Sequence, residues 1–138
     1  MKNRILATLS SLTLLTAAAA FAQSGAVMQF DVPFEFRVGT TILPAGHYHV
    51  GEAGGHVLSI RCFACKAGAM IQTEGVEARK MPETGKLVFN RYNQTYFLSS
   101  VWTPGESQGR QLHKSAAERE LALNGSPATP VQVVLARR

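Results

Sequence analysis

The sequence is poor in the residues that build most reactive centres. It holds two cysteines, four histidines and one tryptophan among 138 residues. It lacks a second C-x-x-C pair that could complete a tetrahedral zinc site. It also has no serine beside a histidine in a recognisable nucleophile elbow, and no glycine-rich loop for phosphate. With no assembled catalytic set, the sequence favours a non-enzymatic protein, and no cofactor is predicted.

A run of basic residues is also missing, although the formal net charge is +5. Lys2 and Arg4 belong to the N-terminal segment, and Arg137 and Arg138 form a small cluster at the other end. The other basic residues are scattered among acids. Nucleic-acid-binding proteins gather such charges into a patch or stripe. We therefore interpret these charges as solvated surface and predict no nucleic-acid partner.

The first 22 residues have the pattern of a signal peptide. A basic start is followed by an apolar stretch over residues 5–15 and by small residues up to Ala22, so cleavage is expected before Gln23. The apolar stretch is too weak to span a bilayer comfortably, and no later segment is long and apolar enough to do so. We expect an exported protein, periplasmic or extracellular, with one β-rich domain at 23–138 and no membrane span after cleavage.

Residues 30–38 carry the clearest secondary-structure signal. Apolar residues occupy every second position, namely Phe30, Val32, Phe34, Phe36 and Val38. Alternate side chains of a strand point to opposite faces, so this segment predicts a strand with one buried face. Pro33 cannot donate a ladder hydrogen bond, which favours an edge strand or a bulge.

Turn residues divide the rest of the chain into further short strands. They are expected at residues 47–52, 56–62, 67–73 with an extension over 76–79, 86–92, 95–103 and 131–136. The hairpin 86–103 is apolar on both faces, which is typical of strands in the middle of a fold. The pattern predicts a mainly β protein, a small antiparallel sandwich or barrel of about seven strands.

One helix is expected at about residues 115–124, where it would cover the outer face of the hairpin. Ser115 and Glu118 match a capping box, in which each side chain satisfies a backbone N–H of the first turn. The helix is too short to be stable alone, so it must dock on the sheet. The apolar stripe expected to make this contact consists of Ala117, Leu121 and Ala122.

The cysteines form a single C-x-x-C pair, Cys62 and Cys65. In an oxidising compartment two cysteines usually pair with each other, so a structural disulfide is favoured. Free thiols and a metal or redox role are the alternatives. The motif lies between strands rather than at a helix N-terminus, and Lys66 follows it where covalent haem attachment needs a histidine.

His47 and His49 stand two apart on one expected strand, so their rings face the same way. This spacing makes them weak candidates for metal ligands, should another histidine come near. Solvent exposure opposite Tyr48 and Val50 explains them without a metal, and none is predicted.

Several aromatic residues and one arginine could line a binding pocket. The speculative ligand-binding residues are Tyr48, Arg91, Tyr92, Tyr96 and Trp102. Aromatic side chains more often fill a β core. If Arg91 pointed inward it would need a carboxylate or a bound anion, but the sequence leaves its facing open.

Five blocks of the sequence resemble a group of short exported proteins of unknown function that are abundant in acidobacteria. They are residues 30–36, LPAGxYxV at 43–50, KLVFxRY at 86–92, YFLxxVW at 96–102 and SxxERELA at 115–122. The resemblance implies a compact β domain outside the cytoplasm and assigns no activity or ligand.

Taken together, the residues and the resemblance favour a protein that acts through a binding or interaction surface. Its partner would be a small molecule, a glycan or another envelope protein. A metal or redox protein using the cysteine pair and an enzyme of unrecognised type are the alternatives.

Overall fold

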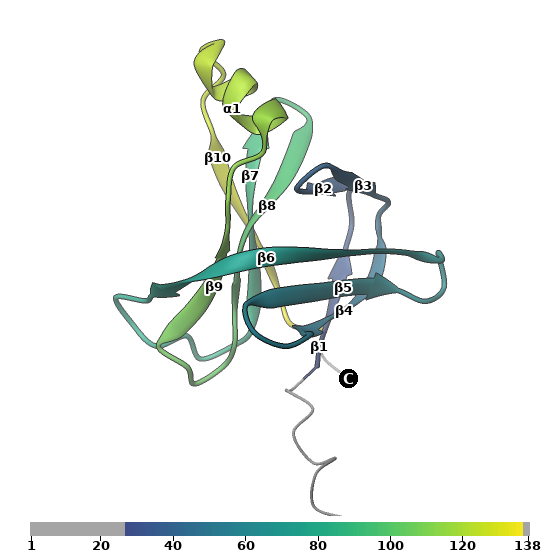
Figure 1. The fold of residues 1–138 in the computed structure, drawn as a ribbon, viewed down its shortest axis with the longest axis vertical. Coiled ribbons are helices and arrows are strands. Elements are labelled where there is room, and N and C mark those ends of the chain that lie inside the picture. The colour runs from purple at the N-terminus through teal and green to yellow at the C-terminus, as the bar shows by residue number, and fades with distance from the viewer. Residues whose placement is uncertain (1–26, 137–138) are drawn as a thin grey trace, which may run out of the picture.

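Ten strands and one helix form within residues 27–136, the part of the chain that the computed structural model describes (Figure 1). The strands are β1 (Met28–Val32), β2 (Phe36–Val38), β3 (Thr41–Leu43), β4 (Gly46–Glu52), β5 (Val57–Cys62), β6 (Ala67–Glu77), β7 (Lys86–Tyr92), β8 (Thr95–Trp102), β9 (Gln108–Leu112) and β10 (Thr129–Val134). The helix α1 spans Ala116–Leu123. The predicted signal peptide and the two C-terminal arginines lie outside the described residues.

The long strand β6 joins two halves of one bent sheet. Its residues 67–72 pair with β5, and its residues 73–77 pair with β9. One half has the order β1-β4-β5-β6, and the other continues through β9, β8, β7 and β10. Figure 1 shows β5 and β6 running across the direction of β7, β8 and β10. Strands that pass from one layer to the other make the corners of orthogonal β packings.

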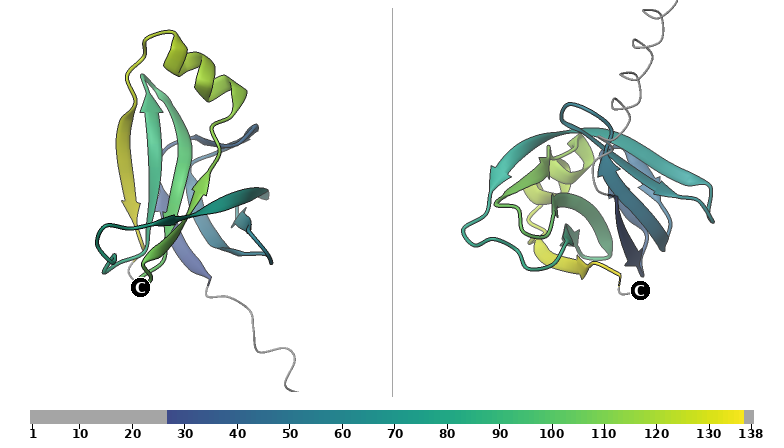
Figure 2. Two further views of the ribbon diagram at one scale, coloured as in Figure 1. Left: turned by 60° about the vertical axis from the view of Figure 1, so that its left-hand side comes forward. Right: turned by 90° about the horizontal axis from the view of Figure 1, so that it is seen from below.

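The mainly β class is confirmed, with antiparallel pairing throughout the described strands except at one contact. That contact is the parallel pair of β2 with β8 at Arg37 and Phe97. The strand count exceeds the predicted seven. The end strands β1 and β10 approach each other, and the Ala136 amide donates to the Gln29 carbonyl at 2.9 Å. They form no ladder, so the sheet is not a closed barrel (Figure 2).

The strand predicted over residues 30–38 forms as two strands. Pro33 has no N–H to donate, and the ladder ends at Val32. β1 pairs with β4, whereas β2 pairs with β3 and β8. The alternation was nevertheless predicted correctly for four of its five apolar residues, Phe30, Val32, Phe36 and Val38, which are all buried.

Two strands were missed because their sequences carry little strand pattern. β3 has three residues and follows the turn at Gly39, which adopts a positive φ of 60°. β9 has the sequence QGRQL, with a single apolar residue at its end. Strands of this kind form because they pair with neighbouring strands in the sheet, and their own sequence periodicity does not reveal them.

The helix starts and ends as predicted but docks differently. The Ser115 hydroxyl accepts a hydrogen bond from the Glu118 amide at 3.2 Å. The expected apolar stripe is wrong, because Ala117 and Ala122 are exposed and Leu121 is only half-buried. Glu118 is the buried residue of the helix, and its carboxylate contacts the β7–β8 hairpin instead of completing the capping box.

Candidate functional site

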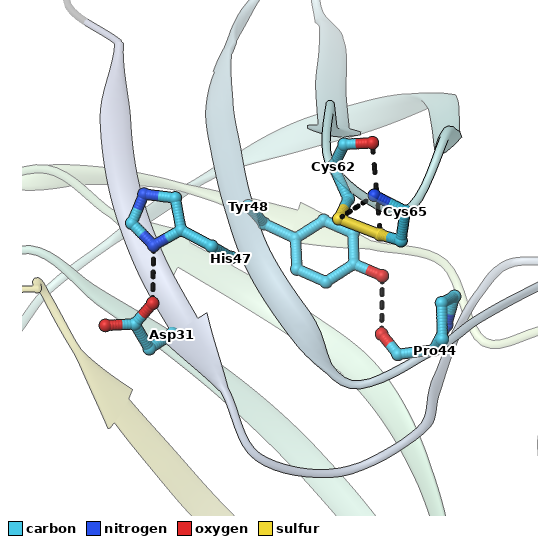
Figure 3. Close-up of a disulfide and its surroundings, with 6 residues drawn as sticks. All are labelled: Asp31, Pro44, His47, Tyr48, Cys62 and Cys65. Atoms are coloured by element: carbon cyan, nitrogen blue, oxygen red, sulfur yellow. Dashed lines mark hydrogen bonds and ion pairs between the residues drawn. A yellow bond between two sulfur atoms is a disulfide. The ribbon is translucent and has the colours of Figure 1, made fainter.

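Cys62 and Cys65 are joined in a disulfide that closes the turn between β5 and β6 (Figure 3). Their Cα atoms lie 5.5 Å apart. The bond packs on the start of β4, where a Cβ on Gly46 would lie 3.2 Å from one sulfur and 3.5 Å from the other. Cys62 is buried as part of the core. The bond thus joins the exposed turn residue Cys65 to the core residue Cys62.

His47 and His49 share the outer face of β4, while Tyr48 and Val50 are buried beneath it. In Figure 3 His47 points toward β1, where its Nδ1 bonds to the Asp31 carboxylate. The two histidine rings lie 5.6 Å apart, and His49 packs edge-on against the Phe63 ring. Within residues 27–136 no three His, Cys, Asp or Glu side chains gather where they could hold a metal.

The structure places the five speculative ligand-binding residues at separate sites. Tyr48 is fully buried and its hydroxyl donates to the Pro44 carbonyl. Tyr92 is buried beneath the helix, and Tyr96 is half-buried and stacked on Phe34 at 3.8 Å. Trp102 stands half-exposed near the other end of the hairpin, and Arg91 is exposed. They do not line one pocket.

Tyr92 belongs to a buried polar cluster that ties the helix to the hairpin. Its hydroxyl donates to Glu118 Oε1 at 3.2 Å, and the Asn90 side-chain amide donates to the same oxygen at 3.0 Å. Burial raises the pKa of the Tyr92 phenol above its usual value, and the Glu118 carboxylate raises it further by charge repulsion and by accepting its hydrogen bond. The neutral phenol therefore stabilises the folded state.

The stabilisation from Tyr92 is expected to disappear in alkaline solution. The folded-state pKa is higher than the unfolded value of about 10, so the contribution is complete below about pH 10 and is lost as the pH rises through the folded pKa. Tyr92→Phe removes this titration while keeping the ring. Urea unfolding across this range should show wild-type stability falling toward that of the variant, whereas a constant difference would contradict the assignment.

A hollow of about 250 Å³ opens at the inner face of the sheet, where β4 ends and β5 and β9 begin. Its floor is apolar and consists of Met28, Leu58 and Val101. Charged and polar side chains stand at its rim, among them Glu52 and Arg110. We call this space the mouth hollow. Concave sites with apolar walls and a few convergent polar groups are the usual form of a small-molecule site.

Arg110 organises the rim of the mouth hollow. Its Nε donates to Glu52 Oε1 at 2.8 Å, and its Nη1 donates to His56 Nδ1 at 2.9 Å. The three residues come from β9, β4 and the turn before β5, and the Arg110 side chain is 22% exposed. A guanidinium held by two partners keeps its remaining N–H groups in a fixed direction. The rim can therefore orient a ligand that accepts hydrogen bonds.

Sequence reasoning did not single out Glu52 or Arg110. They stand 58 residues apart, and β9 lacks the apolar alternation that would have assigned its inward face. The inward position of Arg110 follows from its pairing with Val101 of β8, which is set by the whole sheet.

Within the described residues no helix is long and apolar enough to cross a membrane. Comparisons of the chain with protein-family models, curated proteins and solved structures found no match.

Proposed function

We propose that this protein is an exported, non-enzymatic binding protein whose ligand site is the mouth hollow. The observation that carries the proposal is the apolar floor beneath an arginine held by Glu52 and His56. The floor favours an apolar body on the ligand, and the Arg110 rim favours one hydrogen-bond-accepting group. The ligand is accordingly a small molecule rather than a polymer or a protein.

Two features support a location outside the cytoplasm. The first 22 residues have the basic, apolar and small-residue order of a signal peptide. The disulfide at the β5–β6 turn fits an oxidising compartment, because cytosolic thiols are kept reduced. N-terminal sequencing of the protein from its own host tests this part of the proposal, since export with cleavage predicts a chain that begins at Gln23.

Filling the mouth hollow is expected to abolish ligand binding. Val101→Phe adds a ring at the floor, whereas Val88→Phe makes the same change on the outer face of the hairpin. Overpacking costs about 1–3 kcal/mol, so thermal melting must first show that both variants are folded. Native mass spectrometry of protein purified from its host should then show a bound small molecule in wild type and Val88→Phe but not in Val101→Phe. A wild-type protein without any added mass would count against the proposal.

A further inference from the structure

A second depression of about 370 Å³ lies on the opposite, outer face of the sheet, beside Trp102. Strand β6, the connection from β6 to β7 and the start of β7 form its walls. Apart from one acid, its main side chains are those of Val76, Arg79, Lys80, Pro82, Lys86 and Trp102. We call it the tryptophan groove. It shares no lining residue with the mouth hollow.

Trp102 lies flat over its neighbour in the sheet because that neighbour is a glycine. A Cβ on Gly109 would lie 2.6–2.8 Å from three atoms of the indole ring, so any larger residue would displace the ring. The indole Nε1 donates to the Ser100 hydroxyl at 3.0 Å and fixes the ring's rotation. The ring is thereby set against Gly109 of the sheet, and Trp102 is at the same time a lining residue of the groove.

The wall opposite the indole is held in place by the backbone. The Ala78 amide donates to the Ser107 carbonyl at 2.8 Å, and the Gly105 amide donates to the Pro82 carbonyl at 2.9 Å. These bonds tie the β6–β7 connection to the β8–β9 turn. A site whose walls are already fixed loses little conformational entropy when a ligand binds.

The charge of the tryptophan groove is positive. Arg79, Lys80 and Lys86 line it, against a single acid, Glu77. Among the ion pairs of residues 27–136 none involves these three basic residues. Their charges are available to a partner, and an anionic partner complements them.

We propose that the tryptophan groove binds an anionic sugar, a pyranose ring carrying a carboxylate or sulfate group, as a unit of an acidic polysaccharide. The C–H face of the sugar ring packs on the indole, and the acidic group pairs with Arg79 or a neighbouring lysine. Glu77 accepts from sugar hydroxyls. A single aromatic platform matches one ring, whereas proteins that track single-stranded nucleic acid stack successive bases on several aromatic side chains.

The test uses oligomers of a polyuronate as the probe, with neutral dextran oligomers and a thymidine oligonucleotide beside them, in isothermal titration calorimetry at low salt. We expect binding of the polyuronate, at least tenfold weaker binding of dextran and of the oligonucleotide, and weakening as salt is raised. Trp102→Ala should weaken polyuronate binding at least tenfold. Arg79→Gln should weaken it severalfold, and Arg91→Gln, which removes an exposed positive charge elsewhere, should leave it unchanged.

Gly109→Ala provides a variant that keeps the indole but moves it. Since a Cβ at this position collides with the ring, we expect it to weaken polyuronate binding while the fold, checked by circular dichroism, is retained. Equal losses in Arg79→Gln and Arg91→Gln would show nonspecific attraction of a polyanion and overturn the proposal. So would tighter binding of the oligonucleotide, equal binding of dextran, or no binding of polyuronate.

Discussion

Glu118→Ala is expected to lower the free energy of unfolding by about 2–4 kcal/mol. Glu118 is 4% exposed, and one of its carboxylate oxygens accepts hydrogen bonds from both Asn90 and Tyr92. Alanine leaves the buried Tyr92 hydroxyl and the half-buried Asn90 amide without this partner, and a buried unpaired donor costs about 1–3 kcal/mol. The substitution also removes a negative charge from the first turn, where it stabilises the helix.

The structure offers two matched controls for this result. Glu118→Gln keeps an oxygen acceptor at the same place and should cost less than the alanine variant. Glu120→Ala removes an exposed acid from the same helix and should change stability by less than about 0.5 kcal/mol. Chemical denaturation gives the stabilities, and amide exchange shows whether the helix opens alone. Similar losses for Glu118→Ala and Glu120→Ala would mean that the polar cluster does not anchor the helix.

The way the helix docks shows where local sequence patterns stop being informative. The pattern around Ser115 predicted the start of the helix correctly because capping depends on neighbours along the chain. The buried face could not be read in the same way. Glu118 is buried because Asn90 and Tyr92, 28 and 26 residues away, provide donors for it. Such compensation is decided by tertiary structure, and a periodicity argument assigns acids to the solvent.

The two depressions show the same limit of local sequence patterns. Trp102 was singled out from the sequence, but its proposed role as a platform depends on Gly109, which lies in a strand that the sequence did not reveal. Glu52 and Arg110 were not singled out, because their meeting depends on the register of β9 against β8. Strands with a strong apolar alternation could be predicted from the sequence. The residues that pack against them from strands without such alternation could not.

Removing the disulfide through Cys62→Ala/Cys65→Ala is expected to lower the free energy of unfolding by about 2–3 kcal/mol. Closing a loop of this size contributes about 2 kcal/mol by the chain-entropy relation. The rest comes from packing, since Cys62 is 2% exposed and a Cβ on Gly46, at the start of β4, would lie in contact with both sulfurs and the ring of Tyr48. Denaturation in urea, with and without a thiol reductant, measures the loss.

Treatment with a reductant distinguishes the contribution of the disulfide bond to stability from that of the packed sulfur. Wild-type protein treated with dithiothreitol should lose the loop contribution but keep the buried sulfur, so its stability should fall between those of the oxidised protein and the alanine variant. The variant itself should not respond to the reagent. Because the disulfide lies on Gly46 and Tyr48, toward the opposite end of β4 from Glu52, the mouth hollow should keep its ligand in the double variant. Loss of the ligand would mean instead that the β5–β6 turn controls the shape of the whole sheet.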